Sequence, residues 1–177
     1  ERAAQIPGKL YLVDNLNDPI TVKDQIDMQD IAQVAMVVIF ICKNGRVDVQ
    51  IDRKDYTMRG GDVMSLLPGT VFQFVNTCES TECAVIAMHP DFINYTSDVK
   101  LGIEFARMLH DNPIQKLDYP MMEEAIGIYK AIKNKLYRSG YRYKEEVAKN
   151  YLNIMKIFKQ IHKKAYDREL TDTTLRY

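Results

Sequence analysis

The residue types that could perform chemistry are few and widely spaced in this chain. The three histidines are His89, His110 and His162. They fall at the expected end of a strand, at the end of a short helix and on the exposed side of the last helix. No arrangement of these residues brings two imidazoles together with a carboxylate, and a serine or cysteine nucleophile has no evident base. We therefore expect the chain not to be an enzyme.

The three cysteines do not form a recognisable site either. Cys42, Cys78 and Cys83 are odd in number and have neither C-x-x-C spacing nor histidine partners at the spacing of a zinc site. Cys42 lies in an apolar run, which favours burial as a small hydrophobic side chain over a redox role. We expect reduced thiols, as in a cytoplasmic protein, and neither a metal ion nor another cofactor.

The residues from Asn44 to Phe74 predict a series of short antiparallel strands. Polar and apolar residues alternate from Arg46 to Asp52, with the period of two that marks a strand buried on one face. Gly60-Gly61 and Pro68-Gly69 mark turns. Strands this short and regularly punctuated indicate a small barrel or sandwich.

Further strands are predicted on both sides of this series. Ala32 to Cys42 is almost continuously apolar and rich in β-branched residues, which predicts a central strand buried on both faces. Cys83 to Met88 predicts another buried strand. Glu1 to Asn17 is expected to form an arm or an edge strand with its own apolar face.

Helical periodicity replaces the strand pattern after residue 90. A short helix is expected between Asp91 and Asn112, with Ile103 and Leu109 on its apolar face. Asp118-Tyr119-Pro120 predicts the start of a second helix, which should end at Ser139-Gly140. Its apolar face consists of Met122, Ala125, Tyr129, Ile132 and Leu136.

The last helix is expected to begin near Tyr143 and carries an apolar seam of heptad type. The seam is the candidate dimer interface and consists of Val147, Tyr151, Ile154, Phe158, Ile161 and Ala165. The alternative is that it only packs on the preceding helix. Because the first half of the helix is apolar over more than one stripe, we favour self-association into a homodimer.

Charge is unevenly distributed along a chain whose formal net charge is zero. The segment from Ile128 to Arg168 holds twelve Lys and Arg residues against three acidic residues. These cations are spread around the polar faces of two amphipathic helices, and no short turn precedes a recognition helix as helix-turn-helix geometry requires. We favour solvated helix faces, and a basic surface close to DNA held by another domain is the open alternative.

The order of these parts resembles the N-terminal cupin domain of AraC-type transcription regulators, in the branch common in gut Bacteroides-like bacteria. The resemblance covers nearly the whole chain. It is carried by a strand ending in Asn44-Gly45, the run VDVQIDRKDYTMRGGDVMSLLPGTVFQF, the strand CAVIAMHP and two helices separated by Gly140 to Tyr143. It implies a mainly β fold, a cupin-like double-stranded β-barrel (jelly roll), followed by an α-helical hairpin.

The two cupin motifs depart from those of the metal-binding members of that superfamily. Those members carry paired histidines and a glutamate after a glycine in the first motif. Here Gly45 is followed by Asp48, Gln50 and Asp52, and this motif contains no histidine. In the second motif the turn glycines and proline are kept, but Gln73 stands about where a histidine is found. These departures agree with the regulator branch, in which the barrel is a receptor for a small molecule.

The resemblance implies a cytoplasmic ligand-sensing and dimerisation domain that lacks the DNA-binding helix-turn-helix domain of its parent protein. Its partners are then an unknown small-molecule effector and a second copy of the chain, with DNA reached only through the absent C-terminal domain and no membrane involved. Residues 1–90 form the barrel with its N-terminal arm, 91–170 the helical region with the dimerisation helix, and 171–177 the start of a linker.

The candidate pocket residues are side chains expected to line the barrel interior. Aromatic rings offer flat apolar walls, and an amide offers both a donor and an acceptor. The set is Tyr11, Phe40, Tyr56, Phe72, Gln73 and Phe74, with the segment around Tyr11 as a candidate lid. For each aromatic residue, ordinary core packing is the alternative.

Two alternatives of other functional classes stay open. One is a small cupin enzyme whose metal ion is held by carboxylates such as Asp48, Asp52 and Glu82. The other is a stand-alone cupin that binds a small molecule and has no DNA partner.

Overall fold

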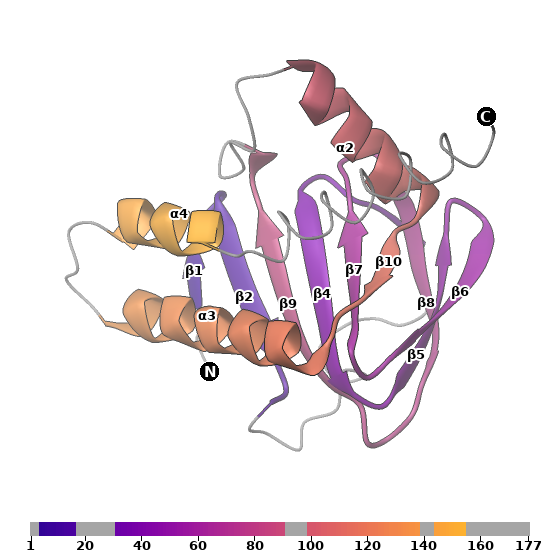
Figure 1. Cartoon of the computed structure of the whole chain (residues 1–177), viewed down its shortest axis with the longest axis horizontal. Coiled ribbons are helices and arrows are strands. Elements are labelled where there is room, and N and C mark those ends of the chain that lie inside the picture. Colours follow the sequence, from indigo (N-terminus) through magenta and orange to yellow (C-terminus); the bar gives the residue numbers. More distant parts are fainter. Residues whose placement is uncertain (1–3, 17–30, 91–98, 139–143, 155–177) are drawn as a thin grey trace, which may run out of the picture.

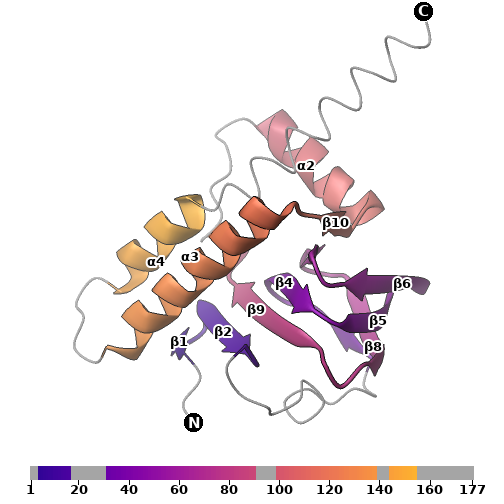
Figure 2. The same ribbon diagram turned by 60° about the horizontal axis from the view of Figure 1, so that its bottom comes forward.

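Two antiparallel sheets face each other in the structure, and two helices cover the outer face of the larger sheet (Figures 1 and 2). The structure is a computed structural model that describes residues 4–16, 31–90, 99–138 and 144–154. Within these ranges the chain is mainly β with helices in its C-terminal part, as the sequence patterns predict.

The larger sheet has six strands in the order β1-β2-β9-β4-β7-β10, and every neighbouring pair is antiparallel. Its strands are β1 (Ala4–Ile6), β2 (Leu10–Asp14), β4 (Val37–Asn44), β7 (Asp62–Leu66), β9 (Glu82–Met88) and β10 (Ile114–Lys116). The smaller sheet has the order β3-β8-β5-β6. It consists of β3 (Ala32–Gln33), β5 (Arg46–Ile51), β6 (Lys54–Arg59) and β8 (Val71–Thr77).

The strand series predicted from Asn44 to Phe74 is confirmed as β5, β6, β7 and the first part of β8. The glycines at its turns adopt backbone conformations that other residues rarely adopt. Gly45, between β4 and β5, has φ 95°, and a Cβ atom there would lie 2.5 Å from the Thr81 Cα atom. Only glycine fits this turn, because the left-handed conformation and the close approach of backbone both exclude a side chain.

The single strand predicted from Ala32 to Cys42 is wrong in its first half. Ala32–Gln33 pairs with β8 in the smaller sheet, whereas Val37–Asn44 lies at the centre of the larger one. The chain changes sheets between them, where the Val34 amide donates to the Thr70 carbonyl and the Val34 carbonyl accepts from the Gly69 amide. An apolar run does not reveal such a crossing, because both sheets bury apolar residues.

The N-terminal segment is part of the larger sheet. β1 and β2 form a hairpin, and β2 pairs along its whole length with β9. Leu10 and Leu12 are fully buried. Tyr11 therefore lies in an internal strand between β1 and β9, and its role as part of a lid stays a prediction.

The helix predicted from Asp118 is confirmed as α3 (Tyr119–Tyr137). Asp118 is its N-cap, and the Asp118 carboxylate accepts a hydrogen bond of 2.9 Å from the Met121 amide. A proline occupies the first turn, where its missing N–H has no consequence. All five residues of the predicted apolar face are buried.

The segment before α3 contains a strand that the sequence patterns do not predict. α2 (Val99–Asp111) agrees with the expected short helix and buries Leu109, but Ile103 is 64% exposed although it was assigned to the apolar face. β10 follows and pairs with β7 at the edge of the larger sheet. α4 (Lys144–Ile154) begins close to the predicted start at Tyr143 and lies beside α3 (Figure 2).

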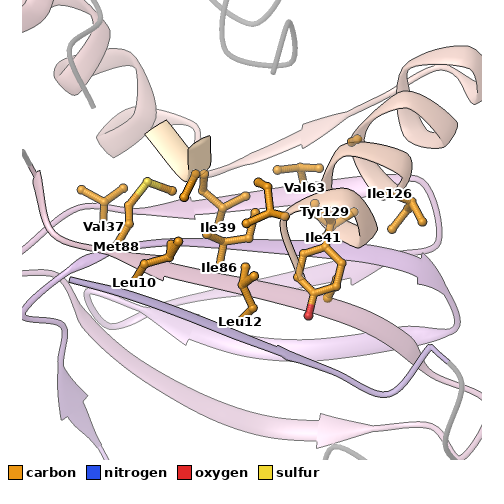
Figure 3. Packing of buried hydrophobic residues seen from close by; sticks show 14 of the residues in the cluster. Leu10, Leu12, Val37, Ile39, Ile41, Val63, Ile86, Met88, Ile126 and Tyr129 are labelled. Carbon is orange, nitrogen blue, oxygen red and sulfur yellow. The ribbon is translucent and has the colours of Figure 1, made fainter. Parts of the chain in front are cut away.

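Side-chain alternation in β4 divides the apolar residues into two cores. Val37, Ile39 and Ile41 point to the helices and pack with Leu12 and Tyr129 (Figure 3). The intervening residues of β4, which include Phe40 and Cys42, face the smaller sheet. Both faces of this strand are therefore buried, as predicted for its second half.

A polar cluster ties α3 to the end of β2. The Asp14 Oδ2 atom accepts hydrogen bonds of 2.6 Å from both the Tyr129 hydroxyl and the Lys133 Nζ atom. Burial alone would raise the pKa of Asp14, but the hydrogen bonds from Lys133, Tyr129 and the Leu16 amide outweigh it and lower that pKa below its usual value. Burial and the neighbouring carboxylate raise the pKa of Tyr129, so its hydroxyl stays a hydrogen-bond donor.

Candidate functional site

A pocket of about 320 Å³ lies where two turns of the sandwich meet the end of α2. This volume is at the lower end of the range for small-molecule sites. The walls come from the end of β5, the end of β7, the turn between β7 and β8, and the segment that leads from α2 to β10. The lining residues are Ile51, Asp52, Ser65, Leu66, Leu67, Pro68, Gly69, Thr70, Leu109, His110 and Pro113.

The turn between β5 and β6 places a carboxylate at the pocket rim. Asp52 and Arg53 have φ values of 47° and 67°, as in the two-residue type I′ turns that join twisted strands. The Asp52 Oδ1 atom accepts a hydrogen bond of 2.9 Å from the Val71 amide, and the Asp52 amide donates to the Val71 carbonyl. These two bonds fix the orientation of the carboxylate.

The turn between β7 and β8 forms a second wall. Pro68 and Gly69 are its central residues, and the Thr70 amide donates to the Leu67 carbonyl. Gly69 has φ 92°, which suits the third position of a type II turn after a proline. The turn predicted from Pro68-Gly69 is confirmed, and it also shapes the pocket.

The end of α2 contributes one apolar and one titratable side chain. Leu109 is buried, whereas the side chain of His110 is 66% exposed at the rim. The His110 Nδ1 atom lies 3.3 Å from the Asp111 carboxylate, and its Nε2 atom lies 3.8 Å from the Asp52 Oδ2 atom. The imidazole therefore stands between two carboxylates.

Ser65 is the buried polar residue of the pocket. It is 4% exposed, and its amide donates a hydrogen bond of 2.9 Å to the Pro113 carbonyl. Within the described parts of the chain, the Ser65 hydroxyl makes no hydrogen bond. Among the described residues, no fully enclosed side-chain oxygen or nitrogen lacks a hydrogen-bond partner. The Ser65 hydroxyl is therefore not fully enclosed, and it faces the pocket that Ser65 lines, where an entering molecule can bond to it.

Serine, histidine and aspartate are the residue types of a hydrolytic triad, and all three line this pocket. Their arrangement here differs from that of a triad. The two imidazole nitrogens face Asp52 and Asp111, and no hydrogen bond joins His110 to Ser65. A serine nucleophile needs an adjacent base to remove its proton. This arrangement is suited to binding a ligand and not to activating the serine.

Four of the six predicted pocket residues come together between the two sheets. The rings of Phe40 and Phe74 are 5.8 Å apart, and those of Phe72 and Phe74 are 4.6 Å apart. Tyr56 packs against the same cluster. None of these residues lines the pocket described above, so their contact with a ligand stays a prediction.

The other two predicted pocket residues lie apart from this cluster. Gln73 is between Phe72 and Phe74 in β8, so side-chain alternation places it on the opposite, outer face of the smaller sheet. Tyr11 is in the larger sheet, where its hydroxyl accepts a hydrogen bond from the Gly8 amide. The structure does not bring these two residues together with the phenylalanines.

The predicted dimer seam is only partly described. Val147 and Tyr151 are half-buried in α4, and Tyr151 packs against the core between the helices and the larger sheet. The side chain of Ile154 and the residues Phe158, Ile161 and Ala165 lie outside the described part of the chain. Of the described seam residues, Tyr151 therefore takes part in packing within the chain.

The carboxylates of the metal-enzyme alternative are not grouped. Asp48 bonds to Arg46 and Thr57 on the outer face of the smaller sheet, Asp52 lies at the pocket rim, and Glu82 is 3.9 Å from the Lys43 Nζ atom. Among the described residues, no three His, Cys, Asp or Glu side chains are placed to hold a metal ion. In the same ranges, no helix is long and apolar enough to cross a membrane.

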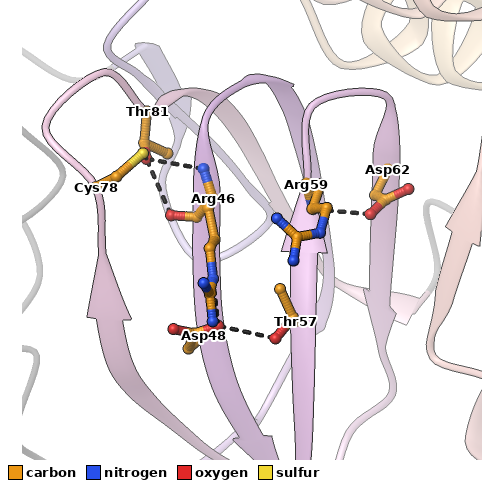
Figure 4. A network of polar contacts seen from close by, with 7 residues as sticks. All are labelled: Arg46, Asp48, Thr57, Arg59, Asp62, Cys78 and Thr81. Atoms are coloured by element: carbon orange, nitrogen blue, oxygen red, sulfur yellow. Dashed lines mark hydrogen bonds and ion pairs between the residues drawn. The ribbon is translucent and has the colours of Figure 1, made fainter.

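The cysteines lie near the turn between β8 and β9, and all three are free. Cys42 is buried, as predicted, and is the register partner of the buried Cys83. Cys78 is exposed, and hydrogen bonds with the Ser80 and Thr81 hydroxyls lower the pKa of its thiol to about 7. Figure 4 shows this thiol beside Thr81 and the start of β5.

Neither a protein-family model nor a curated protein matches the sequence. Among solved structures, apo ToxT from Vibrio cholerae strain SCE256 matches with a TM-score of 0.53 and 12% identity, over 92% of this chain and 58% of that chain. The AraC-like transcriptional activator CuxR matches with a TM-score of 0.43 and 12% identity, over 86% of this chain and 47% of that chain.

An RmlC-like cupin family protein from Methanocaldococcus jannaschii, with a double-stranded β-helix fold, also matches. Its TM-score is 0.30 at 14% identity, over 46% of this chain and 69% of that chain. The chain thus spans about half the length of the two regulators. The predicted fold class is confirmed as a mainly β fold of antiparallel strands followed by C-terminal helices, with the β part formed by two facing sheets.

Proposed function

We propose that this chain is the ligand-sensing and dimerising part of an AraC-type transcription regulator whose DNA-binding domain belongs to a longer parent protein. The observation that carries the proposal is the match to ToxT, an AraC-family regulator, which covers 92% of this chain but 58% of the ToxT chain. A shared fold alone does not define a function. The pocket, with Ser65 in its wall, supplies the independent support.

In this proposal the effector occupies the pocket beside α2. Leu109, His110 and Pro113 belong to the segment that leads through β10 into α3, so a ligand there contacts the connection between the sandwich and the helical hairpin. An effector acts only if it binds one arrangement of the hairpin better than another, because equal affinity shifts no population. The interior aromatic cluster remains the alternative location for the effector.

The proposed dimer forms through the last helix. Its predicted interface consists of Val147, Tyr151, Ile154, Phe158, Ile161 and Ala165. Of these, Tyr151 also packs within the chain. Light scattering at micromolar concentration should give twice the chain mass of 20.5 kDa. A mass near that of one chain, or a dimer that persists in a Phe158→Lys variant, would contradict this interface.

The cellular setting follows from the proposal. A regulator that binds bacterial DNA works in the cytoplasm, and its partners there are a small effector, a second copy and, through the parent protein, DNA. Membership in the Bacteroides-like branch stays a prediction. A role without catalysis agrees with the arrangement of Ser65, His110 and Asp52, in which the serine has no base beside it.

The gene provides the first test. Sequence beyond the codon for Tyr177 should encode two helix-turn-helix units, and the parent protein should bind a promoter with an affinity that a small molecule changes. A stop codon at that point would contradict the regulator proposal and favour a stand-alone binding module. Promoter binding that no small molecule alters would contradict the sensing part of it.

A further inference from the structure

The polar groups of the pocket lie at two separate positions, one buried and one at the rim. Ser65 is 4% exposed, whereas the side chains of Asp52 and His110 are 40% and 66% exposed. Apolar side chains form most of the remaining walls, among them Leu66 and Leu109. A matching ligand therefore has an apolar body with a polar group at each end.

The buried position can accept or donate a hydrogen bond. The Ser65 hydroxyl makes no hydrogen bond within the described residues, although its surroundings are largely apolar. A hydroxyl offers one donor and two acceptor sites, and this one faces the pocket that Ser65 lines. A ligand hydroxyl or amide at this position can exchange a hydrogen bond with the Ser65 hydroxyl.

The rim position favours a cation that donates hydrogen bonds. The Asp52 Oδ2 atom is 3.8 Å from the His110 Nε2 atom, which is too long for a hydrogen bond. In the neutral tautomer that donates from Nδ1 to Asp111, the His110 Nε2 atom is an acceptor. Two acceptors then face each other, and an ammonium group has enough protons to bond both.

The formal charges around the rim also favour a cationic group on the ligand. Asp52 is the carboxylate that lines the pocket, and Asp111 stands behind the imidazole. Arg53 follows Asp52 in the turn but is not among the lining residues. A carboxylate ligand would meet two negative charges here, whereas an amine gains an attractive interaction with Asp52.

We propose that this pocket binds a small primary amine whose apolar body carries a hydrogen-bonding group at the end remote from the amine. The ammonium group contacts Asp52 and His110, the body fills the apolar walls, and the remote group bonds to Ser65. This inference rests on the proposed function, since it specifies the effector class for the site that function assigns to the pocket.

Four commercially available probes with one aromatic body separate the two polar contacts. Tyramine has both the amine and the remote hydroxyl, phenethylamine lacks the hydroxyl, para-ethylphenol lacks the amine, and para-hydroxyphenylacetate carries a carboxylate at the amine end. Calorimetric titration of the folded chain should rank tyramine first. We expect its affinity to exceed that of the carboxylate probe by at least about tenfold.

Two conservative variants assign the contacts to residues. Asp52→Asn keeps the bond to the Val71 amide and tolerates a positive φ, so it removes charge without disturbing the turn. It should weaken tyramine by about tenfold and leave para-ethylphenol unchanged. Ser65→Ala should weaken tyramine by roughly three- to tenfold and leave phenethylamine unchanged. Glu123→Gln, which removes an exposed negative charge on α3, is the control and should change neither affinity.

The outcomes separate this inference from the function on which it rests. Equal or tighter binding of para-hydroxyphenylacetate, or tyramine binding that survives Asp52→Asn, would overturn the amine assignment. A thermal-shift screen of neutral and anionic compounds then decides the function. A binder whose effect is lost in Ser65→Ala keeps the pocket as a sensor for another class, whereas no binder of any class overturns both proposals.

Discussion

The hydroxyl of Tyr129 should contribute measurably to the attachment of α3 to the larger sheet. Tyr129 is fully buried, and its hydroxyl donates a hydrogen bond of 2.6 Å to the Asp14 carboxylate. Replacing it with phenylalanine removes this bond and keeps the ring that packs against Leu12 and Ile41. The change therefore isolates one hydrogen bond to a charged group.

The expected loss of stability depends on the hydrogen bonds that Asp14 keeps in the Tyr129→Phe variant. Its carboxylate retains the Lys133 bond of 2.6 Å and the contact with the Leu16 amide, so it does not become an unpaired buried charge. A hydrogen bond to a charged partner is worth about 1.5–3 kcal/mol. We expect Tyr129→Phe to lower the free energy of unfolding by about 2 kcal/mol and the melting temperature by about 4–8 °C.

Urea denaturation followed by circular dichroism measures this change, and the same helix supplies a matched control. Tyr119→Phe makes the identical chemical change at a residue that is 77% exposed, and it should alter stability by less than about 0.5 kcal/mol. Equal effects of the two substitutions would refute the reasoning. So would a Tyr129→Phe variant as stable as the original chain.

Further expectations concern acid stability, two turns and one thiol. Because the folded-state pKa of Asp14 is lowered, its contribution is complete above its ordinary pKa and is lost as pH falls through the lower folded value. The stability difference between the original chain and Asp14→Asn should therefore shrink from about pH 6 to about pH 3, and a constant difference would contradict the shift. Gly45→Ala should destabilise the chain by at least about 2 kcal/mol, because φ is 95° and the new Cβ would lie 2.5 Å from the Thr81 Cα atom; an unchanged urea midpoint would disprove this constraint. Arg53→Gly should raise the free energy of unfolding by about 1 kcal/mol by relieving a φ of 67°, and a lower melting temperature would count against a strained turn. Iodoacetamide at neutral pH should label Cys78, whose pKa is lowered to about 7, well before the two buried cysteines; mass spectrometry that finds equal labelling would exclude this difference.

Local signals in the sequence predicted the elements whose geometry is local. The Asp118 cap and the apolar face of α3 depend on residues a few positions apart, and both are confirmed. The strand series around Gly45 is confirmed for the same reason, since turn chemistry and alternation fix its register.

Features that depend on contacts between distant segments were not predictable in this way. The change of sheet near Val34 has no turn residue to announce it. The pocket joins Ser65, Asp52 and His110 from different parts of the chain. In the sequence, Ser65 is a residue of a predicted strand, Asp52 belongs to a predicted turn, and His110 lies at the end of a short predicted helix.

The position of Gln73 relative to the phenylalanines was predictable from the sequence alone. Gln73 lies between Phe72 and Phe74, and the period of two in a strand places it on the other face of the sheet. For Tyr11 no local signal was available, because only the pairing of β2 with β9 shows that it lies in an internal strand.

The most direct test of the sensing role is to locate bound small molecules by amide NMR. A fragment library is added to the labelled chain, and the residues whose amide signals shift are mapped. A sensing role at the pocket predicts shifts at Asp52, Ser65, Thr70 and His110. Shifts confined to the interior phenylalanines, or no shifts with any compound, would contradict it.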